Sequence, residues 1–200
     1  MNLSVIRDDS DIIRHHIIAY HYLHRYPDPR SLPFAYRLIV DEKSSAPDGR
    51  LWGIIVMKKP QHHKQKGLFG YDNLPTSWQV LDLARVWIHP DLQTRRDGHS
   101  LCMFSQMVGL VLKRVRWDWL EHHPPRFPSL PYHITLIISY CDLNHHDGAA
   151  YRASNFQRGG FTGDGTKEIY YRKMKELTQR WQSTRPMQLP LFEGIPIRHI

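Results

Sequence analysis

Residues 81–114, LDLARVWIHPDLQTRRDGHSLCMFSQMVGLVLKR, decide the fold of this chain. The aliphatic and β-branched run at 80–88 predicts a strand, and apolar residues at helical spacing over 101–116 predict an amphipathic helix. The loop between them, QTRRDGHS, leads the strand into the N-terminus of that helix. Unpaired N–H groups and the positive helix end can hold an anion such as a pyrophosphate there. This stretch therefore predicts a strand–loop–helix unit with an anion site in its loop.

Strand and helix signals continue on both sides of this unit. In chain order, the sequence predicts a helix from Asp11 to near Tyr26, a hairpin of strands over 35–41 and 51–57, a doubly buried strand over 134–140, a short helix over 148–156, and short strands at 161–162 and 169–172. The prolines of residues 117–131 predict an excursion that is not a continuous helix, and we expect an extended C-terminal tail at 179–200. This order of elements is typical of an α/β or α+β single domain.

The composition narrows the class of protein. The 200 residues are 41% hydrophobic, which is enough for a real core, and 27 Lys+Arg against 19 Asp+Glu give a net charge of +8 that favours a phosphate-bearing partner. No apolar run is long enough to span a membrane, so we expect a cytoplasmic protein with no membrane partner. Cys102 and Cys141 lie far apart and outside any CxxC pattern, which excludes a Cys-rich zinc site; we expect both to be reduced and buried.

Two motifs resemble those of the GNAT superfamily of acetyl-CoA-dependent N-acetyltransferases. In the loop, Arg95-x-x-Gly98-x-Ser100 resembles the Q/R-x-x-G-x-G/A signature that holds the cofactor pyrophosphate, although the loop is longer than usual and its last small residue is Ser. A basic surface turn is the alternative. Residues 148–161, GAAYRASNFQRGGF, resemble the next element of the superfamily. The resemblance implies a GNAT-like domain over residues 1–178, with a central mixed, mostly antiparallel sheet flanked by helices and acetyl-CoA as cofactor.

Four segments resemble a narrower group, the phage Mom family of DNA-modification proteins built on a GNAT-like fold. The segments are HYLHRYP at 21–27, LWGIIVMKKP at 51–60, LDLARVWI at 81–88 and SYCDLNHHDGAAYRASNF at 139–156. The family pattern more often has Glu where this chain has Asp82. The resemblance implies an enzyme that uses acetyl-CoA to convert the adenine amino group in DNA to a carbamoylmethyl form, which protects phage DNA from restriction in the host cell cytoplasm.

The two resemblances together imply a set of site residues. The reacting site would be shaped by Arg85, Ser139, Asp142, His146 and Tyr151. The cofactor would be bound by Trp87, Ile88, Arg95, Gly98, Ser100 and Asn155.

Physical chemistry supports parts of this set and leaves alternatives open. Arg85 lies in an otherwise apolar strand, where a guanidinium needs a partner, so the alternative to a site role is an ion pair with Asp82 or another carboxylate. Asp142 and His146 follow the end of a central strand, where open sheets place ligand sites. They can accept a proton or hold a divalent metal, and an ordinary turn is the alternative. Tyr151 either protonates a leaving thiolate or belongs to the core.

Basic segments supply the case for DNA as a partner. Residues 58–66, 95–96 and 113–116 can contact phosphates, although such runs are also common on solvated surfaces. A target base must leave the duplex before it can react, so an aromatic-lined pocket is expected. Two other functions stay open: an ordinary GNAT N-acetyltransferase acting on a small amine or protein, and a non-catalytic GNAT-like DNA-binding or anti-restriction module. A homodimer in which the tail docks on a second subunit also stays open.

Overall fold

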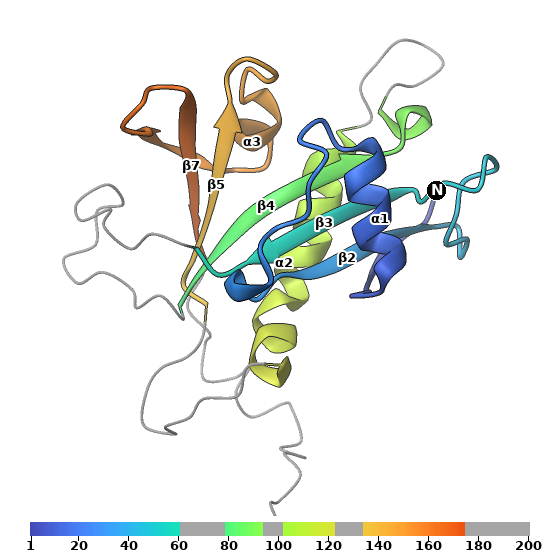
Figure 1. The fold of residues 1–200 in the computed structure, drawn as a ribbon. Helices are drawn as coiled ribbons and strands as arrows, with labels where there is room; N and C mark the ends of the chain where they lie inside the picture. The colour runs from blue at the N-terminus through green and yellow to red at the C-terminus, as the bar shows by residue number, and fades with distance from the viewer. Residues whose placement is uncertain (61–78, 94–101, 123–133, 175–200) are drawn as a thin grey trace, which may run out of the picture.

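A seven-stranded sheet forms the centre of the protein (Figure 1). The computed structural model describes residues 1–60, 79–93, 102–122 and 134–174. Within these residues the strands lie in the order β1-β2-β3-β4-β5-β7-β6, and only the neighbours β4 and β5 are parallel. The strands are β1 Leu3–Arg7, β2 Phe34–Val40, β3 Gly53–Lys58, β4 Val80–Ile88, β5 Leu136–Asp142, β6 Gln157–Phe161 and β7 Lys167–Lys173. The expected mixed, mostly antiparallel sheet is thus confirmed.

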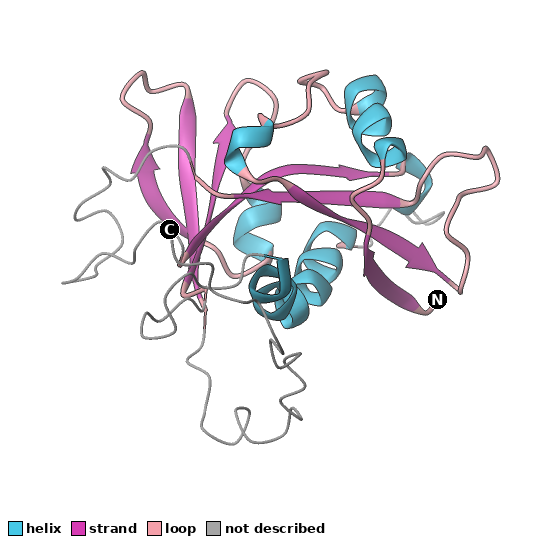
Figure 2. Cartoon of the chain, turned by 60° about the horizontal axis from the view of Figure 1, so that its bottom comes forward, coloured by secondary structure: helices cyan, strands magenta, loops and turns pink. Residues whose placement is uncertain are grey.

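Helices lie on both faces of this sheet (Figure 2). The helices are α1 Asp11–Tyr20, α2 Met103–His122 and α3 Ala149–Ala153, with two 3-10 turns, η1 Pro29–Ser31 and η2 Pro90–Leu92. Residues of β3 alternate between the two faces. Ile55 belongs to the apolar cluster that contains Trp119 of α2, whereas Ile54 and Val56 belong to the cluster that contains Ile13 of α1. The two helices therefore cover opposite faces, and β3 is buried on both.

The pairing of β4 with β5 stops partway along the two strands. Three residue pairs join them, and the last of these is Asp82 with Ile138. Beyond this pair β5 continues to Asp142 along β7, while β4 continues to Ile88 along β3. Figure 1 shows the two strands touching at one end and diverging toward the other. A V-shaped opening thus separates the C-terminal halves of the two central strands.

A β-bulge in β4 lies at the point where the strands part. Val56 pairs with Arg85, and the next residue of β3, Met57, pairs with Leu83, so Ala84 is an extra residue in β4. A bulge increases the local twist and bends its strand. Its position two residues after Asp82 therefore helps to turn β4 away from β5.

The expected C-terminal ends of α1 and α2 are wrong. The first helix ends at Tyr20 rather than near Tyr26, because His21 is extended (φ −83°, ψ 138°) and buried. The last helical turns of α2 occupy residues 117–122, which were expected to be non-helical. Those residues hold no proline, and within them Trp119 is fully buried, so packing continues the helix.

The remaining expectations concern the other strands, the cysteines, membrane spans and the tail. The hairpin expected over 35–41 and 51–57 is confirmed as β2 and β3. The strand expected at 161–162 is β6, which begins earlier, at Gln157, and β1 was not expected. Cys141 is buried, but Cys102 is exposed. Among the described helices, none is long and apolar enough to cross a membrane. The tail at 179–200 lies outside the described residues.

A buried carboxylate connects α2 to the sheet. Asp118 Oδ2 accepts hydrogen bonds from the Tyr36 hydroxyl at 2.7 Å and from Arg114 Nε at 2.6 Å. Burial, and then the hydrogen bond to Asp118, raise the pKa of Tyr36. The hydrogen bond between Tyr36 and Asp118 connects β2 to residues 117–122 of α2, which were expected to be non-helical.

Asp118→Ala should lower the free energy of unfolding by about 2–3 kcal/mol, because it leaves the buried Tyr36 hydroxyl without an acceptor. The matched control is Glu121→Ala, which removes an exposed carboxylate from the same helix and should change stability by less than about 0.5 kcal/mol. Urea unfolding followed by circular dichroism measures both. Equal stabilities for the two variants would contradict the assignment.

Gly148→Ala should lower the free energy of unfolding by about 2–4 kcal/mol. Gly148 caps α3 with φ +75°, and a Cβ there would collide with the hydroxyl of Tyr170. The control is Gly109→Ala in α2, where a Cβ meets no atom within 4 Å. That change should stabilise the helix by up to about 1 kcal/mol. Urea unfolding measures the two effects, and a stable Gly148→Ala protein would contradict this packing.

Candidate active site

The opening between β4 and β5 holds a cavity of about 470 Å³, here called the first cavity. Its walls are residues 83–86 and Ile88 of β4, residues 102–105 at the start of α2, and residues 146–151 around the start of α3. The latter wall includes Gly148, which has no side chain, and Ala149 and Ala150, whose side chains are small. The first cavity is thus a product of the parting of the two strands.

A second cavity, of about 630 Å³, adjoins the first. Three segments line it: residues 82–85 of β4, residues 161–164 at the turn between β6 and β7, and, after α1, Tyr22, Leu23 and Arg25. Five residues line both cavities: Tyr22, Leu83, Ala84, Arg85 and Tyr140. The two cavities therefore meet at the bulge of β4.

Arg85 lies at this junction. Its Nη1 donates a hydrogen bond to the carbonyl of Ala84 at 2.6 Å, and its Nε donates to the carbonyl of Arg25 at 3.3 Å. Burial lowers the pKa of its guanidinium, which still remains charged at neutral pH. The expected alternative, an ion pair with Asp82, is not what the structure has, because Asp82 pairs with Lys58 at 3.3 Å. Arg85 is thus held by neutral carbonyls and, within the described residues, forms no ion pair.

Ser139 and Tyr151 connect the two arms of the opening. Ser139 Oγ of β5 donates a hydrogen bond to the carbonyl of Leu83 on β4 at 2.8 Å and lies 3.0 Å from the hydroxyl of Tyr151. The Tyr151 ring stacks on Tyr170 with ring centroids 4.9 Å apart. Burial raises the pKa of Tyr151, so its hydroxyl keeps its proton at neutral pH. Tyr151 thus packs against the core, as one of the two expectations had it, and it also lines the first cavity.

Of His146 and Asp142, only His146 lines a cavity. His146 lines the first cavity, and its ring makes an edge contact with Tyr22 at 5.4 Å between centroids. Asp142 lines neither cavity. Its Oδ1 accepts from the amide of Asn144, and its carbonyl accepts from the amides of His145 and His146. Asp142 thus shapes the turn that presents His146.

The described residues contain no group of three or more His, Cys, Asp or Glu side chains that could hold a metal ion. The divalent metal that the sequence left open at Asp142 and His146 therefore gains no further ligand from this part of the chain.

The structure does not bring the expected cofactor residues together at one cavity. Ile88 lines the first cavity. Trp87 lies on the α1 side of the sheet, with its ring 4.3 Å from that of His16, and Asn155 follows α3 with φ +59°. Neither of these two lines a described cavity. The signature residues Arg95, Gly98 and Ser100 lie outside the described residues.

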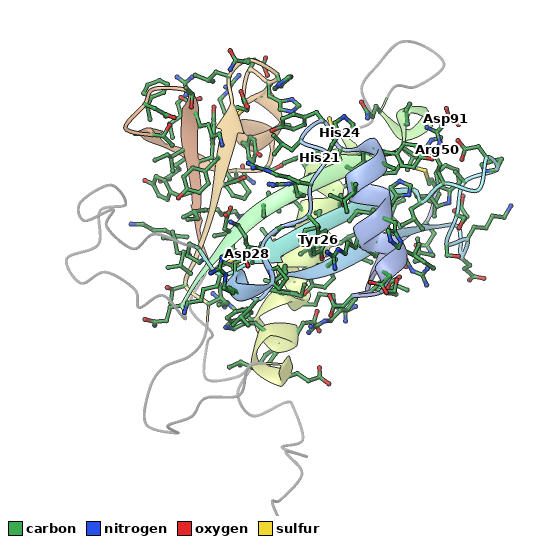
Figure 3. The ribbon with its side chains drawn as sticks, viewed as in Figure 1. His21, His24, Tyr26, Asp28, Arg50 and Asp91 are labelled. Atoms are coloured by element: carbon green, nitrogen blue, oxygen red, sulfur yellow. The ribbon has the colours of Figure 1, made fainter. Side chains whose placement is uncertain are left out.

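Two residues that line the first cavity are not among the expected site residues. His21 and Tyr22 line the first cavity, directly after the early end of α1. Figure 3 shows His21 and His24 in the segment that leaves α1. The only signal for them was the resemblance of HYLHRYP to a family segment, which assigned them no role.

The protonation of His21 follows from its surroundings. Its Nδ1 accepts a hydrogen bond from the amide of Leu23 at 3.2 Å, so the neutral ring carries its proton on Nε2. Burial, and then the charge of Arg85, lower the pKa of His21 to about 4. His21 is therefore a neutral hydrogen-bond donor at pH 7.

Comparisons with known proteins place the fold. A search of protein families finds none that matches this chain, and a search of curated proteins finds no match. Among solved structures, Arabidopsis thaliana NAA60 in complex with acetyl-CoA is similar, with a TM-score of 0.51 and 11% identity over 88% of this chain and 100% of that one. Aminoglycoside acetyltransferase AAC(6')-Ib in complex with coenzyme A gives 0.48 and 11% over 92% and 99%. A GNAT-family acetyltransferase from Staphylococcus aureus MU50 gives 0.43 and 12% over 87% and 100%. By its likeness to NAA60, the chain has the fold of GNAT acetyltransferases.

Proposed function

We propose that the chain is an acyl-CoA-dependent transferase that modifies the amino group of adenine in DNA. The observation that carries this proposal is the pair of cavities that meet at Arg85. A group-transfer enzyme must bring two ligands together at one point, and two adjoining cavities allow each ligand its own entrance. A binding module that holds a single ligand has no need of this arrangement.

The first cavity fits acetyl-CoA. The departure of β5 leaves the edge of β4 after Asp82 without a neighbouring strand, so peptide groups of residues 83–88 can bind an extended chain. The small residues Gly148, Ala149 and Ala150 on the opposite wall leave room for it. The similar fold of Arabidopsis thaliana NAA60 contains acetyl-CoA. The cofactor would supply an acyl group activated as a thioester, with its pyrophosphate at Arg95, Gly98 and Ser100.

Each residue around the junction has a different role in the proposed reaction. His21 offers a neutral N–H, which can stabilise negative charge on a reacting carbonyl oxygen without carrying a charge itself. Tyr151 keeps its proton at neutral pH and can donate it to a leaving thiolate. His146 lies where it can accept a proton from an attacking amine, and Asp142 positions it through the turn. Arg85 orients the acceptor at the point where the cavities meet.

The choice of adenine in DNA rests on the resemblance to the Mom family and on charge. The net charge of +8 favours an acceptor that carries phosphates. The adenine amino group is a poor nucleophile because its lone pair is delocalised into the ring. Direct attack on an acetyl thioester would give an acetylated adenine, whereas a carbamoylmethyl group contains one further NH and is joined through its methylene carbon. The mass of the product therefore decides between simple acyl transfer and the more complex modification.

Acetyl-CoA should raise the melting temperature in a concentration-dependent manner, with a stabilisation of about 2.7 kcal/mol at a concentration 100 times the dissociation constant. The control ligand is inosine 5′-diphosphate, which shares a purine and the pyrophosphate with the cofactor but lacks the part assigned to the first cavity. It should stabilise the protein less. A thermal-shift series measures both ligands. A melting temperature that acetyl-CoA leaves unchanged would favour the non-catalytic module.

Arg85→Ala should lower the yield of modified nucleoside at least about 100-fold, because it removes the charged group at the junction. Mass spectrometry of nucleosides from the DNA of cells that express the protein measures the yield. Arg30→Ala is the matched control, since Arg30 is exposed and its ion pair among the described residues is with Asp28 in its own turn. It should leave the yield at the wild-type level.

Two results of this experiment would count against the proposal. Unmodified adenine in cells that contain acetylated protein or polyamine would assign the chain to the ordinary N-acetyltransferases. Wild-type modification by a folded Arg85→Ala protein would show that the junction is not the reacting site.

A further inference from the structure

The wall of the second cavity contains a buried carboxylate with an unused oxygen. Asp82 is 4% exposed, and its Oδ2 lies 3.3 Å from Lys58 Nζ on the neighbouring strand. Its Oδ1 is buried and has no hydrogen-bond partner in the described part of the chain. A buried acceptor without a donor costs about 1–3 kcal/mol. A ligand that donates an N–H to this carboxylate would recover that cost.

The neighbours of Asp82 do not use its remaining capacity. A carboxylate has about four lone-pair sites, and the ammonium of Lys58 occupies one side only. Arg85, which is three residues further along β4, donates to the carbonyls of Ala84 and Arg25 instead. The pairing of β4 with β5 also ends at Asp82, which opens the sheet beside it. Asp82 thus lies at the start of the opening and lines the second cavity.

The charges around the second cavity restrict the ligand. Four cationic side chains and two carboxylates line it: Arg25, Lys58, Arg85, Lys167, Asp82 and Asp164. The excess of positive charge repels polyamines and other polycationic acceptors and attracts an anionic one. The ligand must therefore carry negative charge and also donate an N–H to Asp82.

Size and shape agree with a nucleotide. The volume of about 630 Å³ lies within the range of about 300–1,000 Å³ that small-molecule sites occupy. Tyr22, Tyr140 and Phe161 line the cavity, and Phe161 is 58% exposed. An exposed aromatic ring can stack on a nucleobase, while the cations can contact its phosphate.

We propose that the second cavity binds a nucleotide whose base carries an amino group, and that Asp82 recognises this base by accepting a hydrogen bond from the amino group. The proposal rests on the function proposed above, because it assigns the acceptor of that reaction to the second cavity. It makes Asp82 the residue that selects the base, and it places the nucleotide in the cavity that meets the first cavity at Arg85.

Equilibrium binding of two nucleotides to the full chain tests this assignment. The probes are 2′-deoxyadenosine 5′-monophosphate and 2′-deoxyinosine 5′-monophosphate, which carry the same sugar and phosphate but an amino group and a carbonyl, respectively, at the same ring position. The wild-type protein should bind the adenine nucleotide about tenfold more tightly, and Asp82→Asn should remove most of this preference. Glu121→Gln, which removes one exposed negative charge far along α2, should retain it.

A second variant keeps the test decisive if Asp82→Asn does not fold. Asp82→Leu combined with Lys58→Met replaces the whole ion pair by apolar side chains of similar size, which proteins often tolerate. This protein should retain its affinity for acetyl-CoA and lose the preference for the adenine nucleotide.

The outcomes separate the site from the reaction. A preference that depends on Asp82, in a protein that leaves DNA unmodified, would support the nucleotide site and reject the proposed reaction. Equal wild-type affinities for the two nucleotides, or a preference that survives in both Asp82 variants, would overturn the site. Binding of spermidine in competition with the adenine nucleotide would also overturn it, because the cationic wall excludes such a ligand.

Discussion

Three residue pairs join β4 to β5, and after Asp82 and Ile138 the two strands follow different partners. β4 stays with β3 through a bulge at Ala84, while β5 stays with β7 over seven residue pairs. Neither strand can return to the other without breaking these antiparallel ladders, so the opening is fixed by backbone hydrogen bonds. Ser139 spans its narrow end with a bond to the carbonyl of Leu83. Both cavities, the position of α3 and the junction at Arg85 depend on this separation.

The two cavities of the opening differ in their surroundings. The first cavity has small residues on one wall and a strand edge on the other, which suits an extended, uncharged chain. The second cavity has charged side chains on several elements, which suits a compact polar ligand. The segment after α1 closes the junction: Tyr22 lies against His145 and His146, and the carbonyl of Arg25 holds Arg85. The early end of α1 therefore allows Tyr22 and Arg25 to reach the junction of the cavities, which a helix continued to Tyr26 would not do.

The sequence predicted what local patterns control. Strand β4 and the start of α2 follow from apolar periodicity, and Arg85 stood out because a guanidinium is costly in an apolar strand. The end of β4–β5 pairing, the bulge and the partner of Asp82 depend on contacts between distant segments, which no local pattern contains. The same holds for the far end of α2: the prolines after His122 were visible, but the burial of Trp119 and the bond between Asp118 and Tyr36 were not. His21 lacked a signal for the same reason, because its role comes from burial near Arg85 and not from its neighbours in sequence.

Asp82 and Arg85 show how the charges of the site are divided. Had they paired with each other, both cavities would be lined by a satisfied ion pair, and neither would favour a ligand strongly. Lys58 pairs with the carboxylate from the adjacent strand, and backbone carbonyls hold the guanidinium, so each group keeps part of its hydrogen-bonding capacity. Burial raises the pKa of Asp82 while Lys58 opposes that rise, which leaves a carboxyl group sensitive to any further donor. A substrate that donates an N–H to Asp82 and brings negative charge to Arg85 satisfies both groups at once. A simple amine satisfies only Asp82.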